Sequence, residues 1–249
     1  MQLCRYKERL NINSAREILQ YQQSNSPLIT IIGEIHEHDF NCGEKNMSLL
    51  DFCRLRLEEN KKCKILLEYP PDFKQQDRIG SKIIRDVFTS SDTKVRKFSS
   101  GVDIRSEFIG IHNQNILYHN EDCLPKDVEK IKEKFVNSFS IEKLKKICGV
   151  ENEEYINKIN YKFENLKKIN YIDSELIYEL KWAWAMVMDC YILSIIGSED
   201  TKSTNEYIII CGNNHVKNLK NEIKLRQITN ITNRDRKKCV MLKDLKKIC

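Results

Sequence analysis

Two segments of the chain place a histidine three positions after a glycine, and both follow short apolar runs. Residues 33–36 read Gly-Glu-Ile-His after the run at 28–32, and residues 212–215 read Gly-Asn-Asn-His after the run at 207–211. Such runs, bounded by Gly or Pro, are typical of buried strands. Titratable groups directly after buried strands are typical of the sites of open α/β sheets. We therefore interpret His36 and His215 as candidate site residues, each delivered by a glycine that turns the backbone off its strand.

Two further predicted strands also end in polar residues. Glu68 follows Ile-Leu-Leu in the run at residues 64–69, where an unpaired carboxylate would be costly to bury. Arg105 follows Asp103 at the end of a weaker predicted strand at residues 98–104. This arginine could bind an anionic group, or be the structural partner of Glu68 or Asp103. If these strands run parallel, all of the polar ends meet at one edge of a sheet.

Two histidines and one carboxylate can do two kinds of chemistry. His36, Glu68 and His215 match a 2-His-1-carboxylate set for a divalent metal such as Mn, Co, Zn or Fe. The metal would lower the pKa of a bound water enough for attack on an ester, amide or phosphate. Alternatively, no metal is present: one histidine is the general base for water, the carboxylates orient the histidines, and Arg105 binds an anionic group. The residue types leave both routes open.

Asp189 is a fifth candidate, because it lies in a predicted helix, residues 173–196, that has little polar surface. A buried carboxylate must be protonated, paired with a cation or near a metal. Its helix precedes the strand that delivers His215, so a role in the site and a local hydrogen bond are both open. His38, His112 and His119 lack such context, and we expect them outside the site.

The remaining patterns predict an α/β fold with a central, mainly parallel sheet flanked by helices. Apolar spacing predicts helices at residues 13–23, 44–58, 72–89 and 216–225, and a last strand at residues 239–242. The strand at 28–32, the helix at 44–58 and the strand at 64–69 form a predicted βαβ unit, which implies parallel pairing with a right-handed crossover.

A charged helical region at residues 127–170 is interrupted at Gly149. We predict that it is inserted in a single α/β domain of residues 1–249. It could be a lid or an interaction arm, or it could add helices to the core. In a further, structural hypothesis, this region contacts a partner and the polar edge of the sheet has no chemistry.

Composition indicates a soluble, globular protein of the cytoplasm. The net charge of +6 is interleaved with acidic residues, so we do not expect a nucleic-acid-binding surface. The ten cysteines form no C-x-x-C pair, which favours packing roles in a reducing, intracellular compartment over a disulfide framework. The N-terminus lacks the apolar core of a signal peptide, and the most apolar segment, residues 182–196, is too short to span a bilayer.

Other catalytic motifs are absent from the sequence. It contains no Walker loop, no G-x-G-x-x-G, no G-x-S-x-G elbow and no H-E-x-x-H. Cys211 directly precedes Gly212, but it belongs to an apolar run, so we interpret it as a packing residue rather than a nucleophile.

The paired G-x-x-H segments, with Glu68 between them, resemble a known superfamily. It contains erythromycin esterase, the haem-binding lipoprotein ChaN, the TraB and GumN families and the TIKI membrane metalloproteases. Residues 33–36 resemble its first motif, Glu68 its acidic second-strand position, and residues 212–215 its closing G-x-x-H. Arg105 is a weaker match to a site arginine. The resemblance implies a central sheet with helices on its faces and an active cleft at the motif edge.

Activity varies within that superfamily, where metal-dependent peptide cleavage, metal-independent ester hydrolysis and haem binding all occur. The resemblance therefore implies a hydrolase, metal-dependent or not, that acts on an ester or peptide bond of a small-molecule or peptide substrate. His36, Glu68 and His215 would form the site, with Arg105 and Asp189 in support. The alternative is a non-catalytic module of the same fold that binds haem, a metal or a small ligand.

Overall fold

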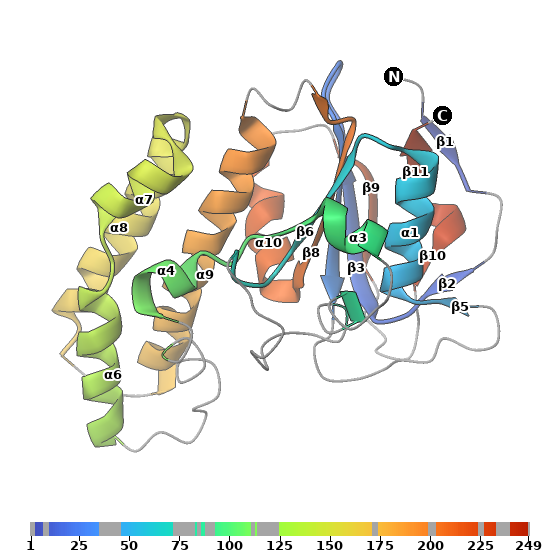
Figure 1. The fold of residues 1–249 in the computed structure, drawn as a ribbon. Coiled ribbons are helices and arrows are strands. Elements are labelled where there is room, and N and C mark those ends of the chain that lie inside the picture. Colours follow the sequence, from blue (N-terminus) through green and yellow to red (C-terminus); the bar gives the residue numbers. More distant parts are fainter. Residues whose placement is uncertain are drawn as a thin grey trace. The chain divides into compact units, whose positions relative to one another are not determined.

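The computed structural model describes residues 3–6, 10–34, 46–71, 83, 86–87, 93–110, 113, 125–170, 174–198, 203–223, 227–232 and 240–248. The chain divides into two compact units, whose elements are labelled in Figure 1. We call Met1–Gly101 together with Ser198–Cys249 the α/β unit, and Val102–Gly197 the helical unit.

The α/β unit is built on one mixed sheet of six strands. In the order in which they lie side by side, the strands are β7 (Ser99–Gly101), β6 (Cys63–Leu67), β8 (Glu206–Gly212), β4 (Leu28–Glu34), β3 (Ala15–Tyr21) and β9 (Gln227–Thr232). The first four run parallel, and β3 pairs antiparallel with both of its neighbours. The prediction of an α/β fold with a mainly parallel sheet is thereby confirmed.

The two strands of the predicted βαβ unit are parallel, but they are not neighbours. β8 lies between β4 and β6 and pairs with both, from Leu28 opposite Glu206 on one side to Leu67 opposite Ile210 on the other. All seven residues of β4 are buried, as are the apolar residues of β8. Near-continuous apolar runs of this kind are typical of parallel strands that are covered on both faces.

The predicted helix at residues 13–23 is wrong, because these residues contain strand β3. Ala15, Ile18 and Leu19 have the spacing of a helix face, but six of the seven residues of β3 are buried, on both sides of the strand. A strand buried on both faces loses the alternation that distinguishes it from a helix. Pairing with β4 and β9 therefore overrides the local pattern.

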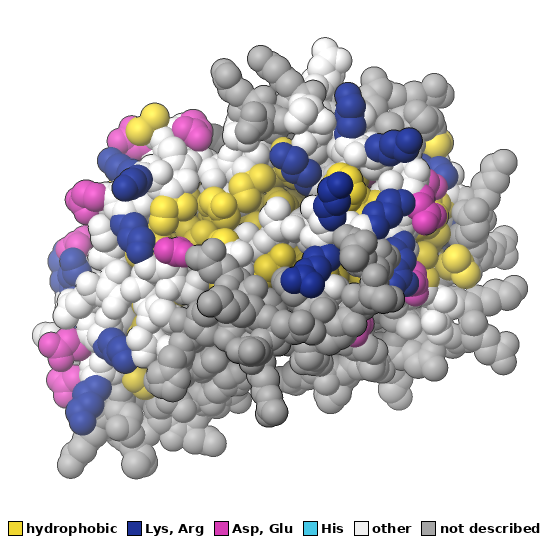
Figure 2. Space-filling model, viewed as in Figure 1, with side chains coloured by type: hydrophobic (Ala, Val, Ile, Leu, Met, Phe, Trp, Pro, Cys, Tyr) yellow, Lys and Arg dark blue, Asp and Glu magenta, His cyan; other side chains and the backbone are white. Residues whose placement is uncertain are grey.

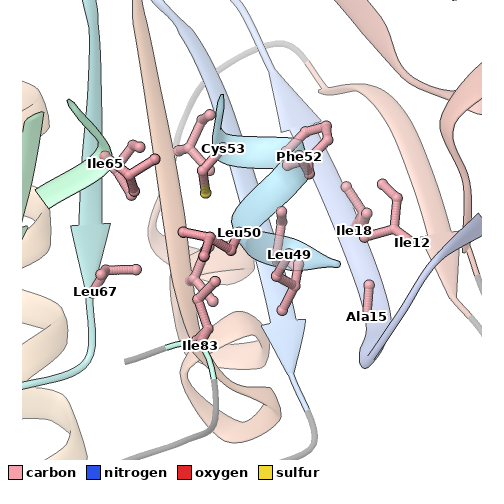
Figure 3. Close-up of a cluster of buried hydrophobic side chains, with 14 of the residues drawn as sticks. Ile12, Ala15, Ile18, Leu49, Leu50, Phe52, Cys53, Ile65, Leu67 and Ile83 are labelled. Atoms are coloured by element: carbon pink, nitrogen blue, oxygen red, sulfur yellow. The ribbon is translucent and has the colours of Figure 1, made fainter. Parts of the chain in front are cut away.

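Helix α1 (Leu49–Glu59) covers one face of the sheet and forms its main core. Ser48 begins the helix, with its side chain accepting a hydrogen bond from the Asp51 backbone N–H. Figure 3 shows Leu50 and Cys53 of this helix among the side chains of the sheet, including Ile18 and Ile65. Ile83 and Val87 add to the same core; they are helical, but most of the predicted helix at 72–89 lies outside the described residues.

Shorter elements complete the α/β unit. They are β1 (Leu3–Arg5) paired with β11 (Lys246–Ile248), β10 (Val240–Met241) beside β2 (Asn11–Ile12) and β5 (Asn46–Met47), the helices α3 (Thr93–Phe98) and α10 (Asn213–Glu222), and the 3-10 turn η3 (Leu242–Asp244). The predicted strand at 239–242 corresponds to β10, but it joins the three-stranded sheet rather than the central one. Figure 2 shows lysine and arginine side chains spread over the described part of one face, with acidic residues among them.

A buried ion pair lies at the amino end of β8. The Arg56 guanidinium of α1 donates to both carboxylate oxygens of Glu206, with Nε–Oε1 at 3.0 Å and Nη2–Oε2 at 2.6 Å. The Asn60 side chain adds a hydrogen bond to Oε2. Arg56 also donates to the hydroxyl of Tyr6 and, at 2.9 Å, to Glu59. Buried charges need this degree of pairing, since desolvation alone would make them unfavourable.

The described elements of the helical unit are α4 (Arg105–Ile109), α6 (Pro125–Asn137), α7 (Ile141–Cys148), the 3-10 turn η1 (Val150–Asn152), α8 (Glu153–Lys168) and α9 (Ser174–Gly197). The predicted helical region at 127–170 lies within this unit. Its helical structure is interrupted at Gly149, as predicted. Trp184 of α9 contacts the rings of Phe139 and Phe163 in the core.

Helix α9 is apolar on all sides. It is longer than residues 182–196, the most apolar segment of the sequence. Residues Glu175–Gly197 have the length and composition of a membrane-spanning helix, with a mean hydropathy of 1.3 over the best window. About half of that window, 56%, is buried inside the protein, and α4, α6, α7 and α8 all pack on α9. Core helices of globular units have the same composition, so this packing accounts for the apolar character of α9.

The described cysteines divide into two kinds. Five are free and buried, namely Cys53, Cys63, Cys148, Cys190 and Cys211, as predicted for small packing residues. Cys4, in contrast, is disulfide-bonded, and its partner lies outside the described residues. This bond does not fit the predicted reducing compartment, so the cytoplasmic location stays a prediction.

Candidate functional site

Three parallel strands of the α/β unit end at one edge of the sheet. Glu34, the last residue of β4, is opposite Gly212, the last residue of β8. On the other side of β8, Leu67 is opposite Ile210, and the Glu68 backbone N–H donates to the Ile210 carbonyl at 3.2 Å. The predicted convergence of the strand ends is therefore confirmed for β4, β6 and β8. This carboxyl edge is where open α/β sheets bind ligands.

Glu68 and His215, which are 147 positions apart in sequence, are in contact at this edge. His215 Nε2 lies 3.2 Å from Glu68 Oε1, and their side chains are 5% and 12% exposed. The same carboxylate accepts a hydrogen bond from the Gly212 backbone N–H through Oε2, at 2.7 Å. A carboxylate that faces an imidazole fixes the orientation of the ring and favours its protonated form.

The start of helix α10 explains this arrangement. Gly212 is the N-cap of α10 in an extended conformation (φ −60°, ψ 151°), and no side chain of its own segment caps the helix. Glu68 from the neighbouring strand end accepts the N-cap N–H instead, as a glutamate does in a capping box. His215 is then the third residue of the helix, and its side chain is held in the first turn.

The glycines of the two motifs do not act as predicted. Gly33 lies inside β4 and Gly212 ends β8, and neither has a positive φ, so neither supplies a sharp left-handed turn. Gly33 instead allows close packing of α10. A Cβ at this position would lie 2.9 Å from Val216 Cγ2 and 3.0 Å from Asn213 Oδ1. The glycine is required because a helix approaches the backbone of the strand.

Two buried acidic residues near this edge were not among the site residues predicted from the sequence. Glu34 is only 4% exposed. Glu17 is 8% exposed and is opposite Gly33 across the β3–β4 pairing. The position of Glu34 at the end of an apolar run was a usable signal. Glu17 was not recognised as a residue of the sheet because residues 13–23 were predicted to form a helix.

Part of the predicted site lies outside the described residues. This applies to His36, the leading candidate of the first motif, and also to His38, His112 and His119. Contact between His36 and the pair Glu68–His215 therefore stays a prediction. It rests on the fact that His36 follows Glu34 by two residues, and that Glu34 is opposite Gly212.

Arg105 and Asp189 both lie in the helical unit. Arg105 begins α4 and makes two hydrogen bonds to the Asp103 carboxylate, with Nε–Oδ1 at 2.6 Å and Nη2–Oδ2 at 2.7 Å. Arg105 is therefore the structural partner of Asp103, which is one of the alternatives predicted from the sequence. Asp189 is completely buried in α9, as predicted. A role for either residue beside Glu68 and His215 stays a prediction.

The donor set at the edge fits part of a metal site. An imidazole nitrogen and a carboxylate oxygen are ligands that Zn, Mn, Co and Fe accept. Their separation of 3.2 Å suits a hydrogen bond, and it also suits two ligand atoms that share one metal at bond lengths of about 2.0–2.2 Å. Among the residues that the structure describes, no group of three His, Cys, Asp or Glu side chains could hold an ion. A third ligand is thus expected from His36.

Comparison with known proteins adds no relative: no family model, no curated protein and no solved structure matches the chain.

Proposed function

We propose that the protein is a hydrolase that acts on an ester or peptide bond at the carboxyl edge of the sheet. The observation that carries the proposal is the contact of His215 with Glu68 at the end of parallel strands, reinforced by the Gly212 N–H. Buried acid–base pairs in such positions are characteristic of functional sites. The substrate would be a small molecule or a peptide.

The residues of the pair have distinct tasks in this proposal. His215 accepts a proton from water as the water oxygen attacks the carbonyl carbon, and the carbonyl π electrons move to oxygen. Glu68 stabilises the imidazolium that forms and holds its orientation. His215 then returns the proton to the leaving alcohol or amine, as the bond to the carbonyl carbon breaks. His36 stays the further candidate of this site predicted from the sequence, and Arg105 stays the candidate for binding an anionic group.

A divalent ion such as Mn, Co, Zn or Fe would be held by His215, Glu68 and His36. When bound, it would supply Lewis acidity that activates water at neutral pH. Glu68 and His215 have suitable donor atoms at a suitable separation, which supports this version.

Further parts of the proposal rest on the sequence resemblance. We infer membership of the superfamily of erythromycin esterase, ChaN, TraB and TIKI from the two G-x-x-H segments and Glu68. We also infer that the helical region at residues 127–170 is an insertion in the α/β chain, with Asp189 of the following helix supporting the site. The order of the units along the chain supports this, because the α/β unit resumes at Ser198.

The test is a hydrolysis assay with ester, peptide and phosphate panels on protein purified without chelator. Its metal content is measured in parallel. His215→Ala and Glu68→Gln should remove turnover while the protein remains folded. Asn214→Ala is the matched control, since Asn214 is exposed in the same helical turn. Metal or haem bound in stoichiometric amount, with no turnover on any panel, would instead support the non-catalytic binding module.

A further inference from the structure

A patch of exposed basic side chains lies near the amino end of β6 in the α/β unit. Lys61 and Lys62 occupy the turn between α1 and β6, and Lys94, Arg96 and Lys97 belong to α3. All five side chains are exposed, and we call them the basic patch. Figure 2 shows lysine and arginine side chains gathered in the region where Figure 1 places α3 and the start of β6.

The fold brings the two basic segments of this patch together. β7 follows α3 directly and runs parallel to β6, with Ser99 opposite Ile65. Helix α3 also packs on both α1 and β6. Neither segment contains an acidic residue, since residues 60–67 read Asn-Lys-Lys-Cys-Lys-Ile-Leu-Leu and residues 93–102 read Thr-Lys-Val-Arg-Lys-Phe-Ser-Ser-Gly-Val. Positive charge is therefore concentrated here, although it is interleaved with acids along the chain.

The core determines which side of α3 faces solvent. Val95 is completely buried, and Phe98 packs partly buried against the same core. The basic residues Lys94, Arg96 and Lys97 occupy the remaining sides of this short helix. They are thus directed outward by the burial of their apolar neighbours.

Hydrogen bonds fix the turn that carries Lys61 and Lys62. The Asn60 side-chain oxygen accepts from the Lys62 backbone N–H at 3.0 Å, and the Asn60 amide nitrogen donates to Glu206 at 3.4 Å. The Lys62 carbonyl accepts from the Asn205 backbone N–H at 2.9 Å. The backbone of the turn is therefore held before any ligand arrives, which lowers the entropy cost of binding.

Three members of the basic patch are available to an external anion. Lys61, Lys62 and Lys97 form no ion pair within the described part of the chain. Exposed ammonium groups with no carboxylate between them attract phosphates, and neutralising phosphates releases counterions from a polyanion.

The acidic residues at the border of the patch leave its charge positive. Glu59 is paired through Oε1 with Lys247 at 2.6 Å and through Oε2 with Arg56 at 2.9 Å. Glu58, beside it at the end of α1, is exposed. Two carboxylates, one of them already paired twice, do not balance the five cations of the patch.

We propose that the basic patch binds the phosphate backbone of double-stranded nucleic acid, without base specificity. Four of its five residues are lysine, which is depleted at protein–protein interfaces. A membrane is disfavoured, because stable anchoring by a polybasic patch needs a second, apolar signal. Among the described residues, the large exposed hydrophobic side chains are Val150, Tyr161 and Tyr178, all in the helical unit. Single strands are disfavoured as well, since their binding uses exposed aromatic platforms.

This binding is separate from the proposed hydrolysis. The patch lies near the amino end of β6, whereas Glu68 follows the carboxyl end of the same strand. The proposal departs from the sequence-based expectation of no nucleic-acid-binding surface. That expectation considered charges along the chain, and the basic patch arises from the packing of α3 beside α1 and β6.

The experiment measures binding of the full chain to a fluorescein-labelled DNA duplex of about 20 base pairs by fluorescence anisotropy. We expect micromolar affinity at about 50 mM NaCl. The logarithm of the binding constant should fall with the logarithm of salt concentration with a slope of about −4, because each neutralised phosphate contributes about −0.9. Combined Lys61→Gln, Lys62→Gln and Lys97→Gln should weaken binding at least about tenfold and make the slope shallower by about 2–3.

The matched control combines Lys130→Gln, Lys146→Gln and Lys168→Gln, which removes the same charge from exposed positions of the helical unit. It should bind the duplex like the native protein, and both variants should keep the native circular dichroism spectrum. Absence of duplex binding at about 50 mM NaCl would overturn the proposal. An equal loss in the control would also overturn it, because net charge rather than the patch would then hold the duplex. Tighter binding to phosphatidylserine vesicles or to poly-glutamate than to the duplex would assign the patch to another partner and likewise contradict it.

Discussion

Glu34 and Gly212 are opposite one another at the ends of β4 and β8, so the two G-x-x-H segments leave the sheet at the same level. Gly33 makes this geometry possible, since it gives α10 room to begin directly beside β4. The repeated motif is thus explained by packing as well as by chemistry. A glycine is required where the helix that carries His215 approaches the neighbouring strand.

Gly33→Ala should destabilise the α/β unit by about 1–3 kcal/mol, because the added methyl group overlaps the buried Val216 and the partly buried Asn213. Urea denaturation measures the change. Gly197→Ala is the control, since a Cβ there meets nothing within 4 Å, and it should change stability by less than about 1 kcal/mol. Equal stability of Gly33→Ala and the native protein would contradict the close approach of α10.

Glu68→Gln should lower the free energy of unfolding by about 1 kcal/mol, since a charge-assisted hydrogen bond at a helix N-terminus becomes a neutral one. The amide oxygen can still accept the Gly212 N–H, which limits the loss. The measurement is urea denaturation beside Glu58→Gln, an exposed control expected within about 0.5 kcal/mol of the native protein. A gain in stability would mean that burial of the carboxylate outweighs its contacts.

Removing either member of the buried pair Arg56–Glu206 should cost about 3–5 kcal/mol, because the other charge is left without its main partner. Arg56→Met and Glu206→Met combined should cost much less than the sum of the single changes, which a double-mutant cycle measures. Arg54→Met removes an exposed ion pair with Asp51 and should cost at most about 1 kcal/mol. Additive single effects would show that the pair does not act as one group.

Tyr21 gives a prediction for alkaline pH. Burial and the charge of Glu17 raise the pKa of Tyr21 to about 12, whereas a tyrosine in an unfolded chain ionises near pH 10. The unfolded state therefore loses this proton first, and it binds fewer protons than the folded state between about pH 10 and 12. Stability from Tyr21 is complete below about pH 10 and falls across this window.

Tyr21→Phe should make that decline shallower, as measured by urea denaturation from pH 8 to 12. Near neutral pH the variant should be as stable as the native protein, or more stable by up to about 1 kcal/mol, because the hydroxyl is buried with no hydrogen-bond partner in the described part of the chain. Tyr161→Phe, at an exposed position of α8, should leave the pH profile unchanged. An identical decline in Tyr21→Phe would assign the alkaline transition to other groups.

The sequence was sufficient for features that depend on uninterrupted local patterns. The buried strands β4, β6 and β8 were predicted because each contains a run rich in Ile or Leu that is followed by Gly or Glu. Since parallel strands align their ends, Glu68 and His215 were expected at the same edge of the sheet, whereas their direct contact also requires β6 and β8 to be neighbours. Neither residue needed a long-range contact to be proposed as a candidate.

The rest of the fold depends on contacts that no local pattern encodes. β3 had helix-like spacing and became a strand because β4 and β9 pair with it. The position of β8 between β4 and β6 is a matter of sheet order, which apolar runs do not specify. The role of Gly33 depends on Val216, which is 183 positions away in sequence. Burial of Glu34 likewise depends on the pairing of β4 with β3 on one side and β8 on the other.

We propose that His215, oriented by Glu68, performs hydrolysis at the sheet edge. The most direct measurement compares kcat/KM of the native protein, His215→Ala and Asn214→Ala on the best substrate from an ester and peptide panel. We expect at least about a 100-fold loss in His215→Ala, with an unchanged circular dichroism spectrum, and near-native activity in Asn214→Ala. Undiminished turnover in a folded His215→Ala variant would contradict it.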